Sequence, residues 1–423
     1  MQSLIINFLL YLLVFIWAYK KAGNRLTFYN LSLALFVFYS FFGVFSYATG
    51  IYSDTFHDNG AMPLKPLLIC FVMIVVMYYP LYKTNKKEFE IKPLYLYNQG
   101  RIDFLCKILF FVFVVNTFAM LVATLSILDS GKGLADMYQD YHDEGLSALN
   151  LSSWQNIIIW NFLPIRNAFT FFCIFVALLK IDQGSNKRFW WALIVFTLMP
   201  DVLMYIIRSA RGEFMYLAFK LLLTYVLLRK YLSKRTKKTI KKCLLVICCI
   251  GAFYSVLITQ DRFDDTAHGS NETLVRYFGE TFPNLSNMLW DNVRHHPMGL
   301  RLFPTYLIGM DVHSFQMSVA ENHEYWASIT GVPILNFKTI FGDLYIDFGA
   351  IGACIIMGVI CLLFLFFLPT NKLTLYRMPF FYIIMHLVTM APTYLGTIPL
   401  QQLIYCIASS VFLYYYLPPK TRG

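Results

Sequence analysis

The chain has 423 residues, of which 58% are hydrophobic, 18% are aromatic and only 14% are charged. A soluble domain needs more charged residues than this on its surface. The composition therefore excludes a soluble protein and predicts an integral membrane protein. The net charge of +11 is a topology signal in such a chain, because the basic residues gather in alternate connectors. No nucleic-acid partner is expected.

Long apolar runs follow one another along the whole chain. A helix needs roughly 20 mostly apolar residues to cross a bilayer. Eleven runs are long enough, near residues 3–19, 27–50, 66–82, 108–128, 156–180, 189–207, 213–229, 243–259, 346–368, 378–395 and 400–417. We expect an all-α polytopic membrane protein of about 11 transmembrane helices (10–12). No repeat or linker divides it, so a single transmembrane helical domain over residues 1–423 is predicted.

Basic residues separate the two sides of the membrane. One set of alternate connectors carries 24 Lys or Arg and 4 Asp or Glu, whereas the opposite set carries 9 and 19. Basic connectors stay in the cytoplasm, so the N-terminus is expected outside and the C-terminus in the cytoplasm. The first span has no Lys or Arg before Lys20, which favours a permanent anchor over a cleaved signal peptide.

One long polar stretch, residues 260–340, interrupts the apolar pattern between the eighth and ninth spans and contains five of the eight histidines. We expect a large extracytoplasmic loop that folds over the bundle and carries the chemistry. No metal or cofactor is expected, because no CxxC zinc spacing occurs and the acidic loop at 129–155 lacks the ligand pattern of a calcium loop.

Three charged residues fall inside expected spans. A charge at mid-bilayer costs about 2.5–3.5 kcal/mol, so Arg166, Asp201 and Lys220 need compensation. All three lie in the outer half of their spans by helix rise. One interpretation is an ion pair between Arg166 and Asp201, which are on consecutive antiparallel spans. The other is a polar recess for the head group of an anionic lipid.

The segment at residues 207–214, Ile-Arg-Ser-Ala-Arg-Gly-Glu-Phe, is the whole connection between two spans. It brings Arg208 and Arg211 to the N-terminus of a helix, where the dipole and free backbone N–H groups favour an anion. Arginine matches phosphate oxygens bidentately, so the arrangement fits a pyrophosphate. The alternative is contact with ordinary lipid phosphates, although positive residues on an outer hairpin oppose the usual charge bias.

This Arg-Ser-Ala-Arg-Gly hairpin resembles that of the O-antigen polymerase family, the Wzy-type oligosaccharide repeat-unit polymerases. The stretch at 341–352, Phe-Gly-Asp-Leu-Tyr-Ile-Asp-Phe-Gly-Ala-Ile-Gly, is similar to a second stretch of that family. The resemblance implies a metal-independent glycosyltransferase on the outer face of the bacterial plasma (inner) membrane. It would join oligosaccharide units carried on undecaprenyl diphosphate, both as donor and as acceptor, into O-antigen or capsular polysaccharide. A chain-length regulator and a flippase are expected partners.

The same resemblance implies roles for particular residues. Arg208 and Arg211 would hold the diphosphate, and arginines of the long loop would close over it. These loop arginines are Arg276, Arg294 and Arg301. The base for the acceptor hydroxyl stays open among three residues, which are Glu280, His296 and His323. Asp343 and Asp347 would begin a helix and stabilise its dipole, as a mainly structural segment.

Other functional classes share these features. A lipid-linked glycan flippase or exporter would use the intramembrane charges as a translocation path, and an O-antigen ligase would transfer finished polymer to another lipid. A membrane sugar O-acyltransferase would need a deeply placed histidine, for which His386 is the one histidine expected inside a span. The sequence leaves these alternatives open.

Overall fold

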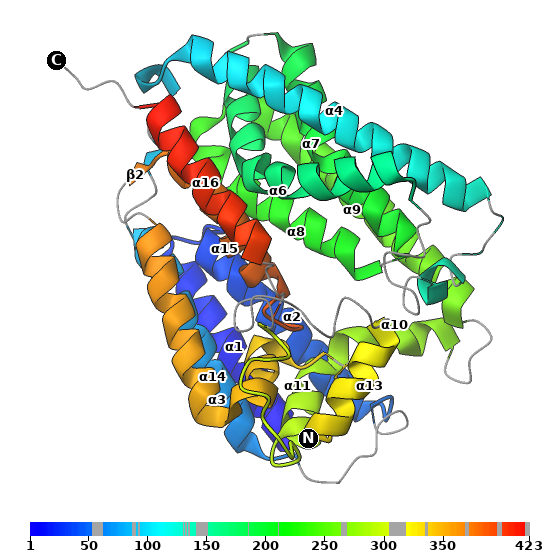
Figure 1. Ribbon diagram of the computed structural model, residues 1–423. Helices are drawn as coiled ribbons and strands as arrows, with labels where there is room; N and C mark the ends of the chain where they lie inside the picture. The colour runs from blue at the N-terminus through cyan, green and yellow to red at the C-terminus, as the bar shows by residue number, and fades with distance from the viewer. Residues whose placement is uncertain are drawn as a thin grey trace. The chain divides into compact units, whose positions relative to one another are not determined.

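The computed structural model describes residues 1–52, 62–86, 90–91, 94–129, 131, 133, 136–140, 151–184, 186–209, 211–263, 269–303, 319–334, 337–368, 372–395 and 400–418. Helices occupy almost all of these ranges, which confirms an all-α polytopic membrane protein (Figure 1). The strands β1 (Glu90–Ile91) and β2 (Lys372–Leu373) form a short parallel pair.

Eight helices in the described ranges are long and apolar enough to cross a membrane. They are α1 (Gln2–Lys21), α2 (Phe28–Ala48), α3 (Leu64–Lys86), α4 (Gln99–Asp129), α6 (Ser153–Asp182), α7 (Lys187–Ile207), α9 (Lys234–Phe263) and α14 (Thr339–Phe367). The other three expected spans correspond to α8 (Arg211–Leu228), α15 (Met378–Met390) and α16 (Leu400–Tyr416), which have 18, 13 and 17 residues. The count of eleven therefore stays a prediction.

The chain forms two compact units. Unit 1 comprises residues 1–88, 262–370 and 386–397, and unit 2 comprises residues 89–261, 371–385 and 398–423. At two of the points where the chain passes from one unit to the other, it does so inside a helix, α9 or α15. No polar linker therefore marks these two points in the sequence. Each unit is described by itself below.

In unit 1, α1 packs on α2 and α3, and α3 packs on the long helix α14 (Figure 1). Helix α10 (Gly269–Gly279) lies against α2. Its last residue, Gly279, is so close to α2 that a Cβ there would be 2.5 Å from the carbonyl oxygen of Phe42. Only a glycine permits this approach, since the atom that a side chain would meet belongs to the backbone.

The expected large loop, residues 260–340, is mostly helical in its described part. It contains α10, α11 (Thr281–Pro283), a π-helical turn η4 (Asn284–Leu289) and α13 (Val319–Thr330). Residues 281–287 are buried. The amide of Asn284 fixes this turn, because its Oδ1 accepts from the Tyr52 hydroxyl at 3.0 Å and its Nδ2 donates to the Phe337 carbonyl at 2.9 Å.

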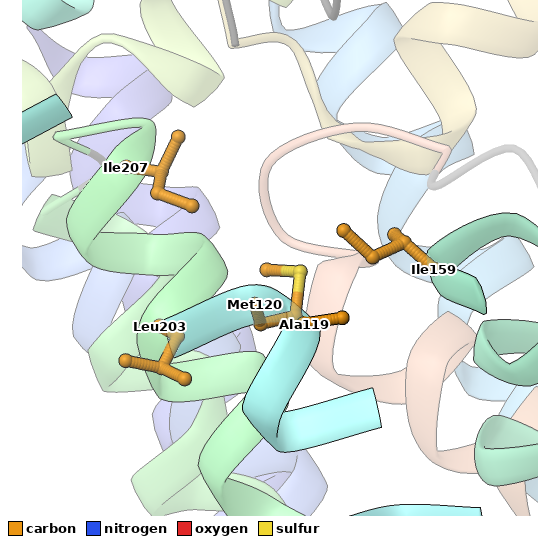
Figure 2. Packing of buried hydrophobic residues seen from close by; sticks show 5 residues of the cluster. All are labelled: Ala119, Met120, Ile159, Leu203 and Ile207. Carbon is orange, nitrogen blue, oxygen red and sulfur yellow. The ribbon is translucent and has the colours of Figure 1, made fainter. Parts of the chain in front are cut away.

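In unit 2, α4, α6 and α7 pack together, with α8, the turn η3 (Arg229–Tyr231) and α9 following in the chain. One buried apolar cluster joins α4, α6 and α7 (Figure 2). Its members are Ala119, Met120, Ile159, Leu203 and Ile207. In α7, Pro200 has no N–H to give the Phe196 carbonyl, which accepts from the Thr117 hydroxyl of α4 at 3.4 Å.

Candidate functional site

The arginine hairpin of unit 2 is a tight turn between α7 and α8. Arg208 caps α7, its N–H donating to the Met204 carbonyl at 3.0 Å, and α8 begins at Arg211. Ser209 between them is fully buried and has a left-handed backbone (φ 45°), which reverses the chain within a few residues. The structure therefore confirms that Arg211 is the first residue of a helix; its side chain lies outside the described part.

Arg166 of α6 and Asp201 of α7 form an ion pair, with 2.6 Å between Nη2 and Oδ1. The same Nη2 donates to Asn167 Oδ1 at 2.8 Å, and Asn167 in turn donates to Gln402 of α16 at 3.1 Å. The Arg166 side chain is 2% exposed and that of Asp201 is 27% exposed. The predicted ion pair is thus confirmed.

Both hydrogen bonds that the Arg166 guanidinium makes to described residues come from one atom, Nη2. The Nε and Nη1 atoms of this group are buried and make no hydrogen bond to any residue that the structure describes. A buried donor without a partner carries a desolvation penalty of about 1–3 kcal/mol, more for a charged group. Asp201 and Arg208 are seven residues apart on α7, so they share one face two turns apart, roughly 10 Å along the axis. The unpaired Nε and Nη1 of Arg166 are candidate hydrogen-bond donors to an anion. Lys220 of α8 instead lies over the ring of Tyr382, with Nζ 6.0 Å from its centroid.

In unit 1, two carboxylates of α14 hold Arg301. Asp347, fully buried, accepts from Arg301 Nε at 2.6 Å and from the Leu302 N–H at 3.1 Å. Asp343 accepts from Arg301 Nη2 at 3.2 Å and from the Leu395 N–H at 2.7 Å. The expected dipole role of the two aspartates is therefore corrected: α14 begins at Thr339, ahead of both, and their main partner is an arginine.

Lys338 completes this buried charge cluster, and the sequence reading missed it. Its Nζ lies 3.6 Å from Asp343 Oδ1 and donates to the Ile334 carbonyl. Burial lowers the pKa of Lys338 to about 8, although Asp343 opposes the shift. The signal in the sequence was a lysine three residues before the stretch at 341–352, which contains Asp343 and Asp347.

Helix α14 is interrupted at Gly349, whose backbone is left-handed and non-helical (φ 66°, ψ −178°). One turn earlier, the carbonyl oxygen of Ile346 lies 2.8 Å from His296 Nδ1. A carbonyl oxygen only accepts, so Nδ1 carries the hydrogen, and in the neutral ring Nε2 is an acceptor. Nε2 lies 3.3 Å from the point where a Cβ of residue 349 would be. His296 is exposed, with its ring edge-on to Tyr345.

The other sequence-predicted residues of unit 1 have separate surroundings. Glu280 is buried, accepts from the Phe337 N–H at 3.2 Å and lies 3.8 Å from Arg276 Nε. Arg294 is exposed, and its aliphatic part lies against the left-handed Gly331. His323 is half-buried on α13. The structure thus brings Arg276 to Glu280, and both His296 and Arg301 to α14.

Long apolar helices define a polytopic membrane protein, and each of its two units holds a buried pair or cluster of charged side chains. Residues 1–281 match the family described as O-antigen polysaccharide polymerase Wzy, and the chain belongs to that family. The match contains Arg166, Asp201, Arg208 and Arg211, whereas Arg301 and the stretch at 341–352 lie beyond it. Comparison with curated proteins and with solved structures gives no significant match.

Proposed function

We propose that this chain polymerises undecaprenyl-diphosphate-linked oligosaccharide units into O-antigen or capsular polysaccharide on the outer face of the bacterial inner membrane. Membership of the polymerase family supports the reaction class. The observation that carries the proposal is the Arg166 guanidinium, which is buried among apolar helices and whose Nε and Nη1 have no partner in the described structure. A lipid-borne diphosphate is the anion that this environment fits.

The reaction exchanges one bond to an anomeric carbon for another. The acceptor hydroxyl oxygen attacks the anomeric carbon of the donor glycan, and the bond from that carbon to the diphosphate oxygen breaks. The electron pair leaves with undecaprenyl diphosphate, and the hydroxyl proton passes to a base. The protein must therefore stabilise a growing negative charge and accept one proton.

Arginines take the first of these roles in our proposal. Arg208 and Arg211 bind the diphosphate at the start of α8, and the unpaired Nε and Nη1 of Arg166 add donors once carrier binding has opened the helices around them. Removing one well-aimed donor typically costs about 2.7–4 kcal/mol of barrier. Arg301 differs, because Asp343 and Asp347 hold its Nε and Nη2, so we assign it a positioning role. Arg294, being exposed, keeps its proposed contact with the substrate.

His296 takes the second role. Its Nδ1 is fixed by Ile346, which leaves Nε2 of the neutral ring as the proton acceptor on an exposed side chain. Glu280 is less suited, because it is buried and engaged by the Phe337 N–H. His323 remains the alternative base.

The test is a pair of arginine variants in the native host. Arg208→Ala should reduce the polysaccharide ladder on a gel to single units, because the donor diphosphate loses a ligand. Arg229→Ala, at the opposite end of α8, is the matched control and should keep the ladder. A normal ladder in Arg208→Ala cells with normal protein levels would overturn the proposal.

The same cells distinguish the exporter and ligase alternatives. A polymerase defect leaves single flipped units on the outer leaflet, whereas an exporter defect leaves unflipped precursor on the inner leaflet. A ligase defect leaves long polymer on its undecaprenyl carrier. Lipid extraction followed by chain-length analysis separates the three outcomes.

A further inference from the structure

Unit 2 contains an apolar cavity that the proposed reaction does not use. It lies between α6, α7, α8 and α9 and encloses about 480 Å³ of empty space, counting its open mouth. Each of the four helices contributes side chains to its lining, for example Leu178, Ile194, Tyr225 and Leu244. Thr224, also in the lining, already donates its hydroxyl to the Lys220 carbonyl at 2.8 Å. The cavity therefore offers a ligand mainly hydrocarbon contact.

All four helices reach the cavity from the same end of the unit. Leu178 precedes the last residue of α6, Asp182, by about 6 Å of helix, and Ile194 follows Lys187 at the start of α7 by about 10 Å. Leu244 follows the first residue of α9, Lys234, by about 15 Å. These depths, about 6–15 Å, are within the thickness of one leaflet, which is about half of the roughly 30 Å hydrocarbon core.

The surface above the cavity is strongly basic. Residues 229–242 contain eight Lys or Arg and no acidic residue. On α9, Lys237 and Lys241 each precede a cavity-lining residue, Ile240 and Leu244, by three positions, so they border the face that lines the cavity. Two acidic residues of the described chain lie at this end of α6. Asp182 accepts the Ser233 N–H at 2.9 Å at the start of α9, and Asp103 pairs with Lys180 at 2.7 Å.

We propose that this cavity binds one acyl chain of an anionic phospholipid, whose phosphate contacts Lys237 and Lys241. The apolar lining selects a hydrocarbon chain, and the basic border selects a head group with net negative charge. A zwitterionic lipid could fill the cavity with an acyl chain, but its head group has no net negative charge to complement the two lysines. The site is separate from the arginine hairpin, which is at the other end of α7 and α8.

The cysteines of α9 provide the measurement. Cys243 lines the cavity and is exposed, and Cys249 is exposed on the same helix outside the lining. The full chain would be placed in vesicles of phosphatidylcholine, with or without phosphatidylglycerol, and alkylated with a maleimide. Mass spectrometry then gives the labelling rate of each cysteine. Their ratio removes the general effect of surface charge on thiol reactivity.

We expect phosphatidylglycerol to slow Cys243 several-fold relative to Cys249. Lys237→Gln/Lys241→Gln should abolish this protection, whereas Lys238→Gln/Lys242→Gln, on the opposite face of α9, should retain it. Equal rates at both cysteines with and without phosphatidylglycerol would overturn the proposal. So would protection by undecaprenyl phosphate in phosphatidylcholine but not by phosphatidylglycerol, since the occupant would then be the carrier.

A second pair of variants tests the cavity itself. Ile194→Trp fills it from α7 and should reduce the phosphatidylglycerol that copurifies with the protein. Val195→Trp adds the same bulk at the neighbouring residue, which is 47% exposed and outside the lining, and should leave the lipid unchanged. Equal lipid retention by both folded variants would contradict the proposal. Polymer formation is not part of either measurement, so failure here leaves the proposed function untouched.

Discussion

His296 donates its Nδ1 hydrogen to the carbonyl oxygen of Ile346, with 2.8 Å between the two atoms. The contact joins the segment after the π-helical turn to α14, just before the helix is interrupted at Gly349. It fixes both the orientation and the tautomer of the ring. The neutral ring therefore presents Nε2 as an acceptor, which is the atom that takes the proton in our proposal.

Replacing His296 by Ala should lower the polymerisation rate by roughly 10²–10⁴, the usual contribution of a positioned base. The rate would be followed with purified lipid-linked repeat units. His295→Ala, at the neighbouring exposed histidine, is the control and should stay near the parent rate. Equal rates for the two variants would remove His296 as the base and leave His323.

Gly349→Ala should both destabilise the protein and obstruct His296. At these backbone angles, which are essentially restricted to glycine, a residue with a Cβ costs about 1–3 kcal/mol, and the new methyl group would lie 3.3 Å from Nε2. Gly358→Ala, in a regular part of the same helix with open space around it, should be neutral or slightly stabilising. Thermal unfolding in detergent compares the two, and an unchanged midpoint for Gly349→Ala would contradict the backbone assignment.

Variants of the ion pair between Arg166 and Asp201 can distinguish an effect on stability from an effect on activity. Asp201→Leu leaves a buried guanidinium without its carboxylate and should cost about 3–5 kcal/mol, near the range for breaking a buried pair. Arg166→Met/Asp201→Leu removes both charges and should recover most of that stability. It should still fail to polymerise, because the donors proposed for the diphosphate are gone. A stable, active double variant would show that the pair is only structural.

Lys338 predicts a pH dependence of stability. Burial lowers its pKa to about 8, whereas an unfolded lysine titrates near 10.4. Between these values the unfolded chain binds the additional proton, so this residue makes the folded state more stable as pH rises through that window. The full effect is on the order of 3 kcal/mol.

The comparison is with the variant Lys338→Met, which lacks this amine and keeps every other ionisable group of the parent protein. The parent protein should gain stability relative to this variant from about pH 8 to about pH 10. Unfolding midpoints measured across the window give the difference. A constant difference would mean that the Lys338 amine is not held in a desolvated site.

Particular residues show which features the sequence could predict. The spans and the pair between Arg166 and Asp201 follow from run length and from the antiparallel order of neighbouring helices, both of which are local. The contact of Arg301 with Asp347 joins residues 46 apart through a segment without periodicity, so no spacing rule reaches it. Gly349 lies in an apolar run that reads as continuous helix, and only its backbone angle in the fold reveals the interruption.

The contact between Gly279 and the Phe42 carbonyl has a consequence for library experiments. Every other amino acid at position 279 would place its first side-chain carbon 2.5 Å from a main-chain oxygen. In saturation mutagenesis scored by surface expression, this codon should tolerate glycine alone, whatever the chemistry of the replacement. Gly23, with open space around it, should accept substitutions far more widely despite its left-handed backbone. Position 279 is therefore a built-in benchmark for deciding when a depleted variant reports misfolding and not lost catalysis.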